Sequence, residues 1–446
     1  SRRLSRKASS TSADAAAAGV RPAGEDDPGV GGTRLSPPVP RLGPRALGLI
    51  LVLAAAARLA LALQVGLGAV QFGDAPAYLY AAEALVQTGR YPSTTDVGFF
   101  RPPGYPAFLV LATLGHPQRL VLAKLANVAL GSVAVLVLAV LSARVFRSRR
   151  IALATGVAAA LAPGLVLISS DVQSEPLFLV FLLAAAFLLL TAVDRPSSTL
   201  ALLAGGALGL SALTRPTSLA LVPFLLAPLA DRRYPFRVRS HIAGAALLGA
   251  LFSVGPWTLR NAVVFHEIIP VSDADGRAFY EGNSVWARRY YALRSREEYA
   301  AWVTAEDRDI RKRLGEVEAG GALSPRQRAR AFRDMALQDI RADPGASLRL
   351  LLRKGWFWLR PYPTTWFRSA GIVWLTGLYY GILYVLAAVG FRSARRRGVR
   401  RFALGALAVS MASHALIIVV WRYRIPYWDP ILLLYGVPGG ARLLFL

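Results

Sequence analysis

Residues 176–193 read PLFLVFLLAAAFLLLTAV, and this stretch contains no charged side chain. As an α-helix it would be about 27 Å long, close to the roughly 30 Å thickness of the hydrocarbon core of a bilayer. Similar blocks recur along the chain, in which 54% of the 446 residues are hydrophobic. Because the apolar residues are gathered in blocks rather than spaced along one face, the sequence predicts an all-α polytopic membrane protein.

About ten such blocks are long enough to be read as transmembrane helices. They are residues 46–65, 119–143, 151–168, 176–193, 199–213, 216–230, 241–258, 370–390, 402–421 and 430–446. We therefore divide the chain into four parts: a disordered cytoplasmic tail (1–45), a transmembrane catalytic module (46–258) with a first outer loop (67–118), an extracytoplasmic segment (259–369) and C-terminal transmembrane helices (370–446). The tail is rich in Ala, Gly, Pro, Ser and Arg, a composition typical of disorder.

The formal net charge of +26 is distributed regularly along the chain. Much of the excess lies in every second segment between the expected spans: Arg2, Arg3, Arg6, Lys7, Arg144, Arg147, Arg149, Arg150, Arg232, Arg233, Arg237, Arg239, Arg392, Arg395, Arg396, Arg397, Arg400 and Arg401. Positively charged loops stay in the cytoplasm, so we expect a multi-pass protein of the inner (plasma) membrane with both termini cytoplasmic. We exclude a nucleic-acid partner, because DNA-binding charge gathers on one soluble face. With no cysteine, the chain has neither disulfides nor thiolate metal sites.

The two long outer segments carry helix signals of their own. In the first, Asp74 is placed to cap a helix that Gly89 ends, and residues 104–115 are apolar but too short to span, which favours an interfacial or re-entrant helix. In the second, a capping box predicts a helix over 325–342, and an amphipathic helix suited to a membrane interface follows Asp343.

Charged side chains gather in the outer loops beside the expected spans. Asp74 follows the first span, and residues 101–106, Arg-Pro-Pro-Gly-Tyr-Pro, hold a guanidinium on a rigid backbone. Asp171 and Glu175 follow the third span, and residues 422–426, Arg-Tyr-Arg-Ile-Pro, follow the ninth. We therefore expect the chemistry of this protein on the non-cytoplasmic face.

Seven short motifs occur in order along the chain: Asp74 with Tyr78, Arg-Pro-Pro-Gly-Tyr-Pro (101–106), Ser-Glu-Pro (174–176), Thr-Arg-Pro (214–216), Pro-Trp-Thr-Leu-Arg-Asn (256–261), Gly-Asn (282–283) and Arg-Tyr-Arg-Ile-Pro (422–426). In their order and topological positions they resemble the C-type glycosyltransferase superfamily, in particular its bacterial branch related to protein O-mannosyltransferases and to aminoarabinose transferases acting on lipid A. The resemblance covers roughly residues 45–440. It implies the C-type glycosyltransferase fold, and, because relatives often carry further spans, a chain that ends earlier than theirs.

The resemblance implies transfer of a hexose or pentose from a polyprenyl-phosphate sugar to an extracytoplasmic protein, lipid or glycan acceptor. Such an in-line displacement requires a carboxylate to take the acceptor proton and cations to hold the leaving phosphate. Inversion at the anomeric carbon and independence of any metal or other cofactor are further implications of the family. The high content of Ala, Arg and Leu favours a GC-rich bacterial genome.

The resemblance assigns roles to ten residues. Asp74 matches the acidic position of the first outer loop and is the expected general base, with helix capping as the alternative. Asp171 and Glu175 match the second acidic loop, where they orient a substrate or merely solvate a turn. We expect four arginines to hold the donor phosphate, unless they only mark the membrane boundary: Arg101, Arg215, Arg422 and Arg424. Three further residues are candidate substrate contacts: Tyr78, Tyr280 and Asn283.

Other classes of protein compete with this reading. The main rival is a transporter or flippase of a polyprenyl-linked sugar, but the expected spans contain no carboxylate away from their ends and no internal repeat is visible. A second rival is an inactive scaffold or lipid-binding subunit. Asp273 and Asp275 form the acidic pair that metal-dependent transferases use, yet a solvated turn explains them more simply, and we expect no metal site.

Overall fold

The computed structural model describes residues 40–444 apart from 72, 93–100, 319–320, 322, 365–369 and 395. The expected tail (1–45) therefore lies almost entirely outside the described residues. Residues Val39–Leu446 form one compact unit. All regular elements in the described part are helices, so the all-α prediction is confirmed there.

Five helices are long and apolar enough to cross a membrane: α1 (Pro44–Val65), α4 (Leu120–Phe146), α7 (Glu175–Asp194), α9 (Phe236–Phe265) and α15 (Ala370–Ser393). A sixth span arises if α5 (Arg149–Ala160) and α6 (Pro163–Ser169) are counted together, although they are bent by 56°. Pro163 lacks the backbone N–H that would continue α5, and this explains the break. The chain is thus a multi-pass membrane protein with at least five candidate spans.

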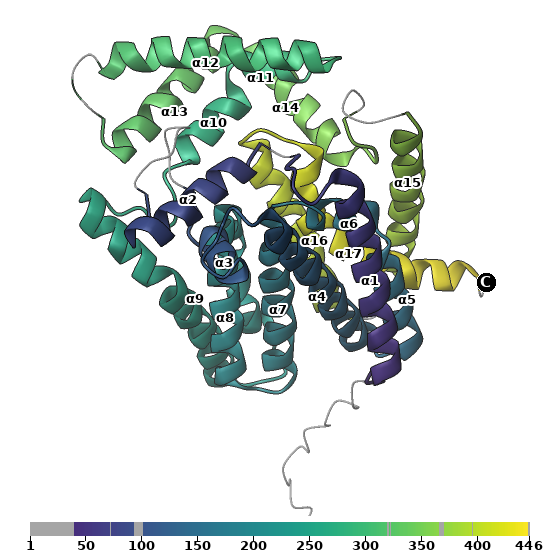
Figure 1. Cartoon of the computed structure of the whole chain (residues 1–446). Coiled ribbons are helices and arrows are strands. Elements are labelled where there is room, and N and C mark those ends of the chain that lie inside the picture. Colours follow the sequence, from purple (N-terminus) through teal and green to yellow (C-terminus); the bar gives the residue numbers. More distant parts are fainter. Residues whose placement is uncertain are drawn as a thin grey trace, which may run out of the picture. The chain divides into compact units, whose positions relative to one another are not determined.

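Four other expected spans are helical but do not meet the same criteria. They are α8 (Ser198–Thr214), η1 (Pro216–Ala230), α16 (Arg397–Ala415) and α17 (Trp421–Leu444). The first is short, and η1 is a 3-10 helix that contains Pro223 and Pro228. Three prolines lie within α17, and its C-terminal part runs across the direction of α15 (Figure 1). The expected count of ten spans is therefore not confirmed.

Small residues let α8 and α9 approach closely along their length. A Cβ atom added to Gly205 would lie 1.7 Å from the carbonyl oxygen of Ala246, and one added to Gly249 would lie 1.9 Å from that of Leu202. Side chains larger than hydrogen are therefore excluded at both positions, as is common where helices pack within membranes.

The loops beside the candidate site fold much as the sequence predicts. Helix α2 (Ala75–Thr88) begins after Asp74 and ends at Gly89, whose φ of 65° is left-handed. Helix α3 (Gly104–Ala112) occupies the short apolar stretch, although its position at an interface is not tested. The capping box of α13 (Pro325–Ala342) is formed by Ser324 and Gln327, as predicted.

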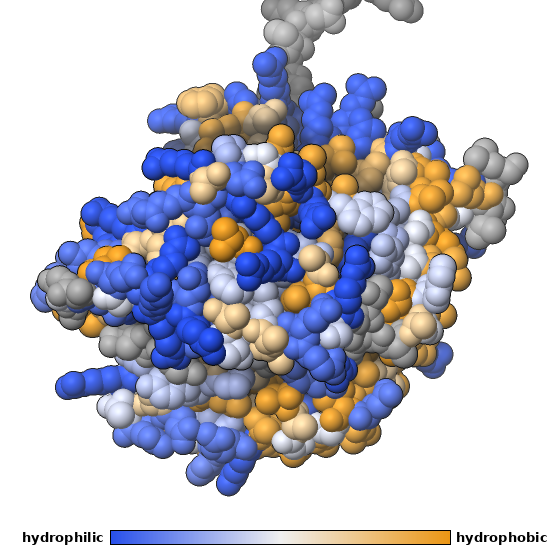
Figure 2. Space-filling model, turned by 90° about the horizontal axis from the view of Figure 1, so that it is seen from above, coloured by the Kyte–Doolittle hydropathy of each residue, from blue (hydrophilic) through white to orange (hydrophobic). Residues whose placement is uncertain are grey.

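Five helices of the 259–369 segment gather over one end of the bundle (Figure 1). They are α10 (Asp275–Asn283), α11 (Val285–Tyr290), α12 (Arg296–Glu318), α13 and α14 (Pro344–Leu359). Figure 2 shows this face from above as largely hydrophilic, with hydrophobic side chains concentrated along one edge. Helix α9 continues to Phe265, past the expected start of this segment at residue 259.

Candidate active site

The side chain of Asp74 does not cap the helix that follows it. Asp74 occupies the N-cap position of α2, but its carboxylate makes no capping hydrogen bond. One carboxylate oxygen instead accepts from Arg101 Nη2 at 3.0 Å, and the other accepts from Arg422 Nη2. The first loop and the start of α17, more than 300 residues apart in sequence, therefore meet at one carboxylate.

Arg422 extends this contact to the ends of two further helices. Its Nε lies 3.2 Å from Glu175 Oε1 at the start of α7, and its Nη1 donates to Gln173 Oε1 at 2.6 Å. Arg215, which follows α8, lies 3.1 Å from the same Glu175 oxygen. Three of the four arginines expected at a phosphate site are thus brought together around two carboxylates.

Aromatic and hydroxyl groups complete the cluster. Tyr78, one turn along α2 from Asp74, shares a hydrogen bond with Ser174 Oγ at 3.0 Å, and Arg215 also donates to that oxygen at 3.2 Å. The guanidinium groups of Arg215 and Arg422 both lie over the ring of Tyr423, at 5.2 and 5.3 Å. The ring of Tyr423 thus packs against both guanidinium groups, a contact that arginine favours.

Exposure decides which members of the cluster a ligand can reach. The side chains of Asp74 and Arg101 are each 20% exposed, whereas that of Glu175 is fully buried. Arg422 and Arg215 lie between these extremes, at 10% and 13%. A ligand would therefore meet Asp74 and Arg101 first, with Glu175 supporting the arginines from behind.

The charges of the cluster do not cancel. Three guanidinium groups (Arg101, Arg215 and Arg422) face two carboxylates (Asp74 and Glu175), which leaves an excess of one positive charge. Burial alone would raise the pKa of the Asp74 carboxyl, but the charges of Arg422 and Arg101 and the hydrogen bond from Arg422 hold that pKa well below its usual range. The site is thus an anion-attracting cluster that contains an ionised carboxylate.

Asp171 lies apart from this cluster. Its Oδ1 is 3.2 Å from the ammonium group of Lys124, and both side chains are almost fully buried. Asp171 also accepts from the backbone N–H of Gln71 at 2.7 Å, while Lys124 donates to the carbonyl of Gly66 at 2.8 Å. The pair thus anchors the chain just before Asp74.

Arg424 does not join the other three arginines. It is fully buried and its Nη1 donates to the carbonyls of Trp358 and Arg360, at 2.9 and 2.6 Å, and to Tyr384 Oη. In this position it satisfies carbonyl groups at the C-terminal end of α14. The structure therefore gives Arg424 a contact that holds α14 against α17.

Tyr280 and Asn283 also lie outside the cluster, within the 259–369 segment. Tyr280 is fully buried among Ile310, Phe332 and other apolar residues, and its hydroxyl donates to Asp309. Asn283 donates to the carbonyl of Leu416 and accepts from Lys354, so it connects α10 to α14 and α16. Of the three expected substrate contacts, only Tyr78 lies in the cluster.

Sequence reasoning missed several residues that shape the site. Gln173 and Tyr423 contact Arg422, and Lys124 pairs with Asp171, which holds the chain just before Asp74. Gln173 and Tyr423 lie directly beside residues that were singled out, and a lysine inside the apolar stretch 119–143 is itself a signal. In the part of the chain that the structure describes, no cluster of three or more His, Cys, Asp or Glu side chains is placed to hold a metal ion.

Comparisons with known proteins match both the sequence and the fold. Residues 101–259, which contain Arg101, Glu175 and Arg215, match the family model described as dolichyl-phosphate-mannose-protein mannosyltransferase. The oligosaccharyltransferase AglB of Archaeoglobus fulgidus, tethered to an acceptor peptide, is similar at a TM-score of 0.53 and 15% identity, over 90% of this chain and 50% of that chain. No curated protein matches the chain in sequence.

Two other solved structures are similar in the same way. AglB in complex with an inhibitory peptide and a dolichol-phosphate gives a TM-score of 0.52 at 15% identity, over 90% of this chain and 50% of that chain. ArnT of Cupriavidus metallidurans bound to undecaprenyl phosphate gives 0.43 at 14% identity, over 89% of this chain and 78% of that chain. The chain thus spans about half the length of the oligosaccharyltransferase.

The chain shares its fold with the oligosaccharyltransferase AglB. More particularly, this is the fold of the C-type glycosyltransferases, so the resemblance that the order of the motifs predicts is confirmed for the fold, with residues 101–259 matching the mannosyltransferase family model.

Proposed function

We propose that the protein transfers a hexosyl or pentosyl group from a polyprenyl-phosphate donor to an acceptor outside the cytoplasm. The observation that carries this proposal is the carboxylate of Asp74 held between Arg101 and Arg422. A base and phosphate-binding cations are the groups that such a transfer requires, and here they occupy one partly exposed cluster.

The arginines are suited to hold the donor phosphate. The cluster has one positive charge in excess, which the single charge of a sugar phosphodiester would neutralise. Further negative charge develops on the phosphate as the sugar leaves, and guanidinium groups fixed in advance stabilise it without reorganising. Tyr423 and Glu175 provide that fixation, since both contact Arg215 and Arg422.

Asp74 is the general base of the proposed reaction. The acceptor O–H gives its proton to the carboxylate, its oxygen forms a bond to the anomeric carbon, and the bond from that carbon to the phosphate oxygen breaks. The bonding electron pair leaves with the polyprenyl phosphate, and displacement from the opposite side inverts the anomeric centre. No metal takes part in this scheme.

Donor binding would change the basicity of Asp74. Without donor, Arg101 and Arg422 each donate a hydrogen bond to this carboxylate and hold its pKa low, which makes it a weak base. A phosphate that draws both guanidinium groups toward itself weakens those contacts and raises the pKa. The donor itself would thus prepare the base for the acceptor.

The remaining residues fit supporting roles. Tyr78 lies beside Arg101, whose guanidinium is 5.4 Å from the centre of the tyrosine ring, and is a substrate contact in this scheme. Helices α10 to α14 lie over the same end of the bundle and would shape the acceptor site (Figure 1). The sequence pattern puts this end outside the cytoplasmic membrane and both termini inside.

Replacement of Asp74 tests the proposal. Purified Asp74→Asn protein should transfer labelled sugar from a polyprenyl-phosphate donor at least about a hundredfold more slowly than wild type, because a general base contributes about 10²–10⁴-fold. The control is Glu83→Gln, which removes a carboxylate within α2 that, among the described residues, accepts hydrogen bonds from Gln87 and Gln118. Equal rates for wild type and Asp74→Asn would contradict the proposal.

One observation favours the alternative of a flippase. Arg58 is fully buried within α1 and donates to the carbonyl of Ala160, where α5 ends at the break before α6. Charged groups and broken helices inside a bundle occur in transporters. Arg58 nevertheless supplies the hydrogen bond that the broken helix lacks, which is a structural explanation. Movement of a polyprenyl-phosphate sugar across liposomes without any acceptor would favour the flippase.

A further inference from the structure

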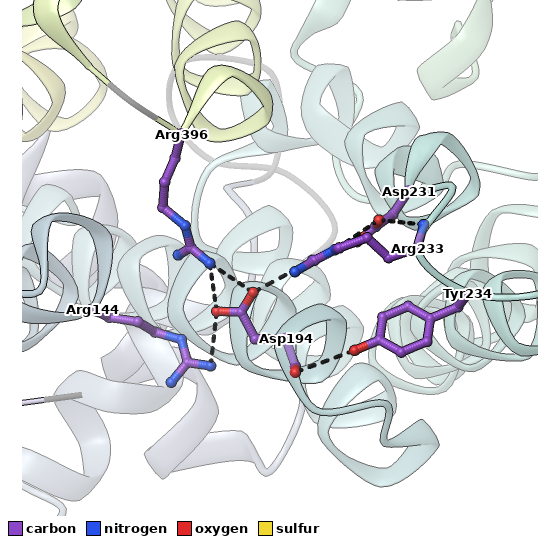
Figure 3. A network of polar contacts seen from close by, with 6 residues as sticks. All are labelled: Arg144, Asp194, Asp231, Arg233, Tyr234 and Arg396. Atoms are coloured by element: carbon purple, nitrogen blue, oxygen red, sulfur yellow. Dashed lines mark hydrogen bonds and ion pairs between the residues drawn. The ribbon is translucent and has the colours of Figure 1, made fainter. Parts of the chain in front are cut away.

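A second charged cluster lies at the opposite end of α7. Asp194 ends this helix, and its carboxylate contacts Arg396 at 2.8 and 3.0 Å, Arg144 at 3.4 Å and Arg233 at 3.6 Å (Figure 3). The three arginines come from three different parts of the chain. Because α7 has 20 residues, this cluster lies about 30 Å from Glu175, roughly the thickness of the hydrocarbon core.

The cluster has more positive than negative charge. Besides Asp194, only Asp231 adds a carboxylate among the residues of Figure 3, and it pairs with Arg233. Three guanidinium groups therefore face two carboxylates. Arg396 Nη1 is buried and has no hydrogen-bond partner among the described residues. A buried donor of this kind is costly unless something accepts its hydrogen bond.

A cavity of about 520 Å³ adjoins Arg396. It lies between the end of α4, the start of α5, the end of α15 and the last part of α17. Arg396 and Arg442 line it together with apolar side chains such as Phe146, Ile151 and Pro438. Its size lies within the range of roughly 300–1,000 Å³ that is typical of small-molecule sites.

Tyr435 adds a second unsatisfied polar atom to this cavity. Its side chain lines the cavity and is fully buried, and its hydroxyl has no hydrogen-bond partner among the described residues. The cavity also adjoins the starts of α5 and α16, since Ile151 lines it and Arg396 is the N-cap residue of α16, and both helix starts contribute a partial positive charge. An acceptor with several oxygens would satisfy both the tyrosine hydroxyl and the arginine.

We propose that this cavity binds an anionic phospholipid. The phosphate would accept from Arg396, Arg442 and Tyr435, while the start of an acyl chain would lie along Phe146 and Pro438. Inorganic phosphate would use the same donors but leave the apolar wall in contact with water, so the wall favours a lipid. This inference does not depend on the proposed transfer reaction, because the cavity is at the other end of the bundle.

Lipid binding to the purified full chain tests the proposal. Native mass spectrometry with phosphatidylglycerol, phosphatidylcholine and inorganic phosphate in separate titrations should show preferred binding of phosphatidylglycerol. We expect Arg442→Gln to weaken that binding about tenfold, because it removes a charged hydrogen-bond donor. Tyr435→Phe keeps the ring and removes only the hydroxyl, so a severalfold loss is expected.

The matched control is Arg237→Gln, which removes an exposed arginine from the first turn of α9 and should leave lipid binding unchanged. The proposal is overturned if phosphatidylglycerol binds no better than phosphatidylcholine, or if both cavity variants bind it as wild type does. Equal binding of inorganic phosphate and phosphatidylglycerol would also overturn it, because the apolar wall would then contribute nothing.

Discussion

Individual charged residues explain most of the candidate site. The sequence left Asp74 open as a helix cap or as a base, and the structure shows its carboxylate turned toward Arg101 and Arg422 instead of the helix N–H groups. Asp171, which lies only four positions before Glu175, pairs with a different cation. Side-chain direction, rather than residue type, separates these two carboxylates.

The pair of Asp171 and Lys124 allows a prediction about stability. Asp171→Asn would leave the ammonium group of Lys124 buried without a counter-charge, and we expect a loss of about 3–5 kcal/mol in the free energy of unfolding. Thermal unfolding in detergent measures the loss. The double variant Asp171→Leu/Lys124→Met should recover most of it, since no charge is then buried. An unchanged midpoint in Asp171→Asn would contradict the structural role.

At the scale of elements, proline determines where an apolar helix breaks and glycine determines how closely two helices approach. Hydrophobicity alone indicates neither. The stretch 151–168 is apolar enough for one span, yet Pro163 divides it into α5 and α6. Gly104 brings α3 close to α8, because an added Cβ would lie 2.8 Å from the carbonyl oxygen of Leu213. This contact places the Arg101 segment beside the end of α8, where Arg215 lies.

The packing of α8 on α9 gives a second prediction. Gly249→Leu would force a side chain against the backbone of Leu202, whereas Gly244→Leu, in the same helix, meets no atom within 4 Å of the added Cβ. We expect Gly249→Leu to lower the midpoint of thermal unfolding strongly and Gly244→Leu to leave it nearly unchanged. Similar midpoints for the two variants would show that the helices separate more easily than the structure indicates.

At the scale of the whole molecule, α10 to α14 are attached to the bundle by polar and close contacts. Lys354 donates to the carbonyl of Ala415, Tyr291 donates to the carbonyl of Val419, and Gly282 lies too near Ile417 for any side chain. These contacts connect α10, α11 and α14 with the end of α16 and the chain that leads from it to α17. The segment is therefore fixed against the part of the bundle that carries Arg422.

The pH dependence of stability provides a test within this segment. Burial, together with the neighbouring charge of Glu281, raises the pKa of Glu306 in α12 from 4.5 to about 8. The folded state then binds more protons than the unfolded state between these values, so stability falls as the pH rises from about 4.5 to about 8. The slope contributed by Glu306 is at most about 1.4 kcal/mol per pH unit.

Glu306→Gln should flatten this dependence, because an amide does not titrate. Thermal unfolding between pH 5 and 8 provides the measurement, with wild type expected to lose stability over this range more steeply than the variant. Glu316→Gln, an exposed position on the same helix, is the control and should follow wild type. Parallel curves for wild type and Glu306→Gln would refute the raised pKa.

The sequence by itself determined the all-helical membrane architecture, the resemblance to the C-type glycosyltransferase fold and several helix limits. Apolar blocks reveal spans because a bilayer has a fixed thickness. The C-terminal glycine of α2 and the capping box of α13 can be recognised because they depend on neighbouring residues. The number of complete spans could not be predicted from the sequence, because broken and short helices are as apolar as unbroken ones.

Only the tertiary structure decided which charged residues meet. Arg422 and Arg424 belong to one motif, yet the first contacts Asp74 and the second contacts carbonyls at the end of α14. Two positions along a helix turn a side chain through about 200°, so the two arginines face opposite sides of α17. Which side faces the candidate site depends on how α17 packs against the rest of the bundle, and no local sequence pattern contains that information.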